Sequence, residues 1–122
     1  MLKIGVLGLG HLGNIHLKCL QPIADFEVVG VYDPNTKAMQ RAVEQYGVRA
    51  FDSVDALLQA VEVVDIVTPT PTHFELATQA LQAGKHLFIE KPITHTLEEA
   101  RALQNLLADR PLKVQVGHVE RF

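Results

Sequence analysis

The stretch Ile4-Gly5-Val6-Leu7-Gly8-Leu9-Gly10-His11-Leu12-Gly13 decides the fold of this chain. An apolar strand runs into three glycines spaced G-x-G-x-x-G, and a helix is expected to follow them. Gly8 permits a tight turn, Gly10 lets the backbone approach a phosphate without a Cβ, and Gly13 lets the helix pack close to the strand. The unpaired N–H groups at the helix start also attract anions. The spacing therefore predicts a dinucleotide-binding turn that includes Leu9, His11 and Leu12, with His11 pointing outward.

A carboxylate supports this interpretation. Asp33 follows the apolar run Phe26–Tyr32 and stands twenty residues after Gly13. It can accept both hydroxyls of an adenosine ribose and would repel a 2′-phosphate, so the pattern favours NAD over NADP. Two alternatives stay open: Lys37 could turn toward a 2′-phosphate, and Asp33 could instead cap a helix opened by Pro34.

The composition fits a sheet that is covered on both faces. The chain has 122 residues, of which 48% are hydrophobic, and it has no Trp. A net charge of −3 without a Lys/Arg cluster argues against nucleic acid or an anionic membrane as a partner. No apolar run approaches the ~18 residues that a membrane span needs. Since Cys19 is the only cysteine, no intrachain disulfide can form, and we expect a reducing, cytoplasmic compartment.

Strand and helix patterns alternate along the chain. Strands are expected at residues 2–7, 26–32, 48–51, 63–67, 86–89 and 113–116. Helices are expected after the glycines, from Pro34 to Gly47, after Asp52 or Ser53, from Thr70-Pro71 to Gly84, and over 96–108 behind a capping box. This predicts one α/β domain over residues 1–122, a Rossmann fold with a doubly wound, six-stranded parallel sheet in the order 3-2-1-4-5-6.

Ligands of such sheets bind at the carboxyl ends of the strands, where two further loops carry polar residues. The first is Thr68-Pro69-Thr70-Pro71-Thr72-His73, whose hydroxyls are expected near the ribose and nicotinamide. Alternatively, Thr70 is only an N-cap. His73 could face the ligand or be an ordinary residue of a first helical turn, and the sequence does not decide between these.

The second loop is Glu90-Lys91-Pro92. Lys91, held extended by the proline, is a candidate to bind a substrate hydroxyl and stabilise the alkoxide that develops during hydride transfer. The alternative is a surface Lys–Glu pair, worth under about 1 kcal/mol. The six histidines show no spacing typical of metal ligands, so no metal site is expected.

Several segments together resemble the Gfo/Idh/MocA family of NAD(P)-dependent oxidoreductases, and the resemblance spans essentially the whole chain. The glycine turn is its generic part. The more specific parts are Thr68-Pro69-Thr70 with His73, Ala83-Gly84-Lys85-His86 leading to Glu90-Lys91-Pro92, and the ending Val116-Gly117-His118-Val119-Glu120-Arg121-Phe122. That ending looks like the branch that includes nucleotide-sugar 3-dehydrogenases.

The resemblance implies roles that spacing alone does not give. Lys91 would lie near the nicotinamide and the substrate hydroxyl, with Glu90 and Pro92 shaping the loop. Thr68, Pro69, Thr70 and His73 would line the cofactor site, and His118 and Arg121 would lie by the nicotinamide or the domain junction. The substrate would be a sugar, nucleotide sugar or polyol.

Family members continue into a second α/β domain that supplies substrate contacts and much of an oligomer interface, and we expect this chain to lack that domain. It would then be the cofactor-binding part of a homo-oligomeric dehydrogenase and inactive by itself. A non-catalytic dinucleotide-binding or sensor module is the main alternative. A methyltransferase that uses S-adenosylmethionine is weaker, because the glycine spacing and Asp33 fit a dinucleotide.

Overall fold

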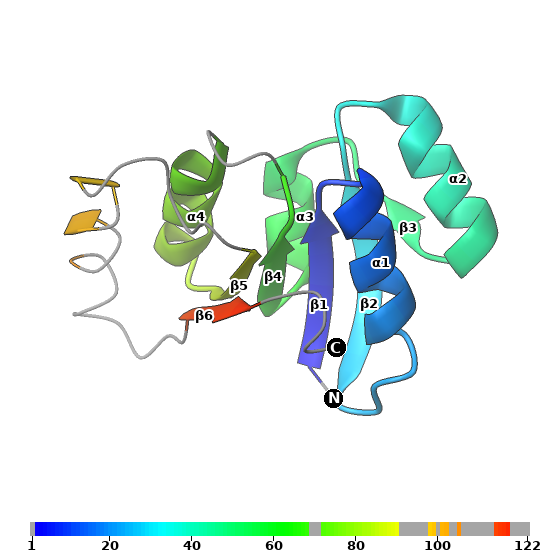
Figure 1. Ribbon diagram of the computed structural model, residues 1–122, viewed down its shortest axis with the longest axis horizontal. Helices are drawn as coiled ribbons and strands as arrows, with labels where there is room; N and C mark the ends of the chain where they lie inside the picture. The colour runs from blue at the N-terminus through cyan, green and yellow to red at the C-terminus, as the bar shows by residue number, and fades with distance from the viewer. Residues whose placement is uncertain are drawn as a thin grey trace.

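Strands and helices alternate in the computed structural model, which describes residues 2–68, 72–90, 98–99, 101–102, 105 and 114–117 (Figure 1). The strands are β1 (Leu2–Leu7), β2 (Phe26–Tyr32), β3 (Arg49–Ala50), β4 (Val63–Ile66), β5 (His86–Glu90) and β6 (Val114–Gly117). The helices between them are α1 (His11–Leu20), α2 (Thr36–Tyr46), α3 (Val54–Ala60) and α4 (His73–Gln82). Residues 98–99, 101–102 and 105 are also helical, but both ends of the helix predicted over 96–108 lie outside the described residues.

All neighbouring strands pair in parallel, in the order β3-β2-β1-β4-β5-β6. The first strand is central, with β2 on one side and β4 on the other, as the sequence predicts. Parallel neighbours need a crossover, and the helices supply it. The Rossmann-like α/β fold with a parallel sheet is therefore confirmed.

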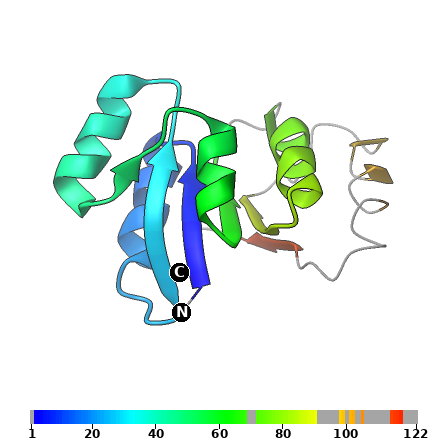
Figure 2. The ribbon, with the colours of Figure 1, turned by 180° about the vertical axis from the view of Figure 1, so that it is seen from behind.

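The helices cover both faces of the sheet. Figure 1 shows α1 in front of β1 and β2, and Figure 2, seen from behind, shows α3 on the opposite face. Side chains that alternate along β1 divide between the two faces: Ile4 and Val6 pack with α1 and α2, whereas Leu7 packs with α3 and α4. Two apolar cores result, and they hold the carboxyl ends of the strands in place.

The structure corrects one predicted helix start. The N-cap of α2 is Asn35, whose side chain accepts hydrogen bonds from the N–H groups of Lys37 and Ala38, so Pro34 precedes the helix and does not open it. The helix α4 begins at His73 after Thr72, and Thr70, the residue predicted as its cap, lies outside the described residues. Of the two residues proposed to cap α3, Ser53 does so, through its hydroxyl and the Ala56 N–H.

Leu57 tests the core between the sheet and α3. Its side chain is fully buried. Leu57→Ala removes apolar contacts and leaves a cavity, so we expect the free energy of unfolding to fall by about 2–5 kcal/mol. Urea denaturation measures this loss. The control is Val43→Ala on the exposed side of α2, 38% exposed, where a change within about 0.5 kcal/mol is expected.

Candidate functional site

The turn between β1 and α1 lies against the carboxyl ends of two other strands. Gly8 has a φ of +102°, which L residues other than glycine rarely adopt. A Cβ at Gly8 would lie 2.9 Å from the backbone of Val67 and Thr68, at the end of β4. On the other side, the Gly8 N–H donates to the carbonyl of Tyr32 in β2 at 3.0 Å. The turn therefore connects the carboxyl ends of three neighbouring strands, β1, β2 and β4.

The other two glycines differ in what surrounds them. A Cβ at Gly13 would collide with the carbonyl oxygen of Gly8, so the close packing of α1 on the turn requires a glycine there. At Gly10, by contrast, a Cβ would meet no atom within 4 Å, and the φ of −69° suits any residue. Nothing in the described part of the chain explains the glycine at position 10, whereas a ligand that approaches the backbone would.

Asp33 is bound to the turn through its carboxylate. The Leu9 N–H donates to Oδ2 at 2.7 Å, and the Asn35 N–H donates to Oδ1 at 2.8 Å. Asp33 thus does not cap α2, which settles one alternative from the sequence. Each carboxylate oxygen has a further acceptor site, so the group can still accept hydroxyl hydrogens from a ribose.

Asn14 and Arg41 belong to the same neighbourhood, although no sequence pattern indicates a role for either. The Asn14 amide donates to the carbonyls of Leu9 and Gly10, each at 3.1 Å, and so stabilises the turn from the α1 side. Arg41 of α2 lines, together with Gly10, a hollow of about 430 Å³ between α1 and α2. Its remaining lining residues are Leu9, Asn14, Ala38 and Gln45.

The side chains of Thr72 and His73 contact Thr68, the second residue after β4. His73 is 2% exposed, and its Nε2 lies 2.6 Å from the carbonyl oxygen of Thr68. A carbonyl can only accept, so Nε2 carries the hydrogen and donates it. The Thr72 hydroxyl lies 2.7 Å from that of Thr68. His73 therefore holds the backbone at Thr68, and a contact between His73 and a ligand stays a prediction.

The remaining predicted site residues divide into three groups. Pro34 and Lys37 are exposed at the start of α2, close to Asp33. His11 and Leu12 begin α1, and Glu90 ends β5, as backbone positions only. Six others lie outside the described residues: Pro69, Thr70, Lys91, Pro92, His118 and Arg121.

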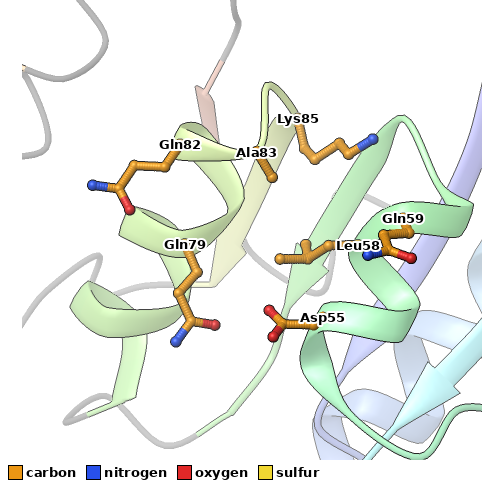
Figure 3. Close-up of a pocket in the computed structure, with 7 residues that line it drawn as sticks. All are labelled: Asp55, Leu58, Gln59, Gln79, Gln82, Ala83 and Lys85. Atoms are coloured by element: carbon orange, nitrogen blue, oxygen red, sulfur yellow. The ribbon is translucent and has the colours of Figure 1, made fainter.

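A second hollow, of about 360 Å³, lies between α3 and α4 (Figure 3). In Figure 3, Asp55 of α3 faces Gln79 of α4, while Lys85 stands just before β5. This places it toward the amino end of β5, away from the glycine turn, so it is not part of the dinucleotide site. Among the residues described, no three His, Cys, Asp or Glu side chains are grouped so that they could hold a metal ion. In the same part of the chain, no helix has the length and apolar character to cross a membrane.

Comparisons with known proteins agree with this geometry. The Gfo/Idh/MocA sequence profile, described as an oxidoreductase family with an NAD-binding Rossmann fold, matches residues 2–118. UDP-N-acetylglucosamine 3-dehydrogenase from Acidithiobacillus ferrooxidans is 44% identical over 98% of this chain and 38% of that protein. Its solved structure superimposes with a TM-score of 0.91, over 98% of this chain and 39% of that one.

Two other similar proteins are named as dehydrogenases of inositols. Inositol 2-dehydrogenase from Rhizobium meliloti is 36% identical over 98% of this chain and 37% of its own length. The structure of scyllo-inositol dehydrogenase from Lactobacillus casei gives a TM-score of 0.92 at 33% identity, over 100% of this chain and 38% of that one. The chain thus spans well under half the length of the relatives that it matches.

Asp33 can be tested without any ligand. Asp33→Ala removes the acceptor for two backbone N–H groups, and hydrogen bonds to a charged group contribute more than neutral ones. We expect the free energy of unfolding to fall by about 1–3 kcal/mol in urea denaturation. Asp25→Ala, at an exposed acidic residue before β2, is the control and should change it by less than about 0.5 kcal/mol. Equal effects of the two substitutions would contradict this role of Asp33.

Proposed function

The chain belongs to the Gfo/Idh/MocA family of oxidoreductases, and from this we propose that it is the NAD-binding domain of a dehydrogenase. The dehydrogenase transfers a hydride between NAD and a hydroxyl-bearing carbon of a sugar, nucleotide sugar or polyol. The names of the relatives support this substrate class, since they include a nucleotide-sugar dehydrogenase and inositol dehydrogenases.

The open space at Gly10 is the observation that carries the proposal. The neighbouring glycines are explained by contacts within the chain, but Gly10 is not. Gly10 is also the N-cap of α1 and has no side chain to bond the first N–H groups of the helix, and the first turn holds no acidic residue. These N–H groups and the positive end of the helix dipole suit a pyrophosphate.

Asp33 supports NAD over NADP as the cofactor. Its carboxylate is fixed beside the turn by two N–H groups, at the position that suits the adenosine ribose. A 2′-phosphate there would meet like-charge repulsion. Arg41 and the exposed Lys37 are the cations nearby that could lessen this repulsion, so the preference is a matter of degree.

Lys91 is the residue that we propose for catalysis. It follows Glu90 in the sequence, and Glu90 ends β5 on the side of the sheet where the parallel strands, β1 with its glycine turn included, have their carboxyl ends. A lysine ammonium donates hydrogen bonds to a substrate oxygen and stabilises negative charge that develops on it. NAD supplies the hydride acceptor. Glu90 and Pro92 shape the loop, and Pro69, Thr70, His118 and Arg121 contribute to the cofactor site.

The proposal extends to the whole protein. Residues 1–122 form one nucleotide-binding domain with a doubly wound, six-stranded sheet, and a second domain supplies the substrate pocket. The lengths of the relatives support this. The chain covers 38% of the UDP-N-acetylglucosamine 3-dehydrogenase and 37% of the inositol 2-dehydrogenase. We further propose that the protein is a cytoplasmic homo-oligomer.

Gly10→Ala separates ligand binding from folding. A methyl group at this position would meet no atom of the described chain within 4 Å, so we expect the melting temperature to stay within about 2 °C of the native value. The methyl would occupy the space needed by the pyrophosphate, so the Kd for NADH should rise at least about tenfold, or 1.4 kcal/mol. Calorimetric titration measures the Kd, and NADPH in the same assay should bind more weakly than NADH to the native protein.

Gly13→Ala is the matched control, because its methyl would collide with the Gly8 carbonyl and should lower the melting temperature. If the native protein bound neither NADH nor NADPH, the proposed function would be wrong.

Lys91→Ala tests catalysis in the protein that carries both this domain and the substrate domain. We expect kcat to fall by about 10²–10⁴-fold with sugar or polyol substrates, because the group that acts on the reacting hydroxyl is lost. The Kd for NADH should change less than about threefold. Spectrophotometric assay of NADH formation measures kcat.

Lys85→Ala controls for the loss of a lysine, since Lys85 lines the hollow between α3 and α4. It should leave kcat unchanged. A protein that binds NADH but reduces no NAD with any sugar, nucleotide sugar or polyol would instead be the non-catalytic module.

A further inference from the structure

A histidine and a carboxylate form a pair in the interior, apart from the residues proposed to bind the cofactor. His16 of α1 and Asp65 of β4 are 0% and 1% exposed, and Nδ1 of the histidine lies 2.6 Å from Oδ2 of the aspartate. Such a buried pair is costly to form, and well-packed apolar residues of similar volume often give equal or greater stability. Its presence therefore calls for a reason other than stability.

The pair joins the two elements that meet at the glycine turn. His16 lies on the second turn of α1, the helix whose first N–H groups point to the proposed pyrophosphate site. Asp65 lies opposite Val6 of β1 and Phe88 of β5. After Asp65, β4 leads within three residues to Thr68, whose backbone lies against Gly8. The hydrogen bond thus connects the helix to the strand that precedes the Thr68 loop.

Phe88 is a second residue that contacts the imidazole of His16 and restricts its orientation. Its ring meets that of His16 edge to face, with centroids 6.0 Å apart and an interplanar angle of 74°. Phe88 also lies two residues before Glu90, the end of β5. The imidazole therefore contacts side chains of both β4 and β5.

We propose that His16 and Asp65 are positioning residues for cofactor binding, an inference that rests on the proposed NAD-binding function. Apolar packing allows one element to slide on another, whereas a hydrogen bond between two given atoms fixes their relative position. The pair holds α1 at one position along β4, so that the pyrophosphate site and the nicotinamide side of the crevice keep the spacing that one NAD molecule needs. Binding geometry of this kind tolerates errors of only about 0.5 Å.

Replacing both partners distinguishes an effect on the stability of the protein from an effect on the position of α1 relative to β4. The double variant His16→Leu/Asp65→Leu removes both members of this pair, so neither is left buried without the other. We expect a melting temperature at or above the native one, yet a Kd for NADH at least fivefold higher by calorimetric titration. Adenosine, which lacks the phosphates, should bind within twofold of native in an NMR titration.

Leu17→Ala is the matched control on α1, because Leu17 is fully buried next to His16 but is not part of the pair. It should lower the melting temperature and leave the NADH Kd within twofold of native. Native NADH affinity in a folded double variant would overturn the inference, as would equal weakening by Leu17→Ala.

Asp65→Asn is a second variant that can overturn the inference even if the double variant does not fold. The amide oxygen still accepts from Nδ1–H of His16, so the NADH Kd should stay within twofold of native. A fivefold rise in folded Asp65→Asn would overturn the inference. Failure of the native protein to bind NADH would instead refute the proposed function, so the two failures are distinguishable.

Discussion

Close backbone packing at the glycine turn is the constraint on which the rest of this structure depends. The carbonyl of Gly8 lies against Gly13, and Gly8 itself lies against Val67 and Thr68. No side chain separates these segments, so the start of α1 and the end of β4 have fixed positions relative to β1. Asp33 and Asn14 then bond the peptide groups between the glycines. The site is therefore formed by backbone geometry, with side chains that hold the backbone in place.

Much of the fold could be predicted because strands such as β1, β2 and β4 are largely apolar. Both β1 and β2 have the predicted bounds, and Gly47 ends α2 with a φ of 69°, as a helix-ending glycine should. The predicted start of α2 was wrong for a local reason. Several residues that can cap a helix stand close together there, and the hydrogen bonds that form depend on how the loop leaves the strand. Local sequence does not contain that information.

The candidate site was predictable only in part. The glycines and Asp33 have a recognisable spacing, whereas His16 and Asp65 are separated by 49 positions and become partners only through the order of the strands. The sequence around His16 does not indicate burial, and the structure shows this histidine to be buried. Asn14 gave no signal either, because an asparagine in the first turns of a helix is common and its bonds to loop carbonyls require the folded turn. Long-range pairing of this kind cannot be read from composition or periodicity.

The strand β3 has a consequence for how copies of the protein can meet. It consists of two residues, Arg49 and Ala50, and pairs with β2 at one edge of the sheet. The guanidinium of Arg49 lies over the ring of Phe51, 4.6 Å from its centroid, which places a charge beside this edge. A short, charged edge offers few peptide groups to a foreign strand and so resists the growth of a continuous sheet between molecules. The edge of the sheet formed by β3 is therefore poorly suited to pair with a strand of another molecule. This resistance to edge-to-edge aggregation has most effect where the concentration of the chain is high.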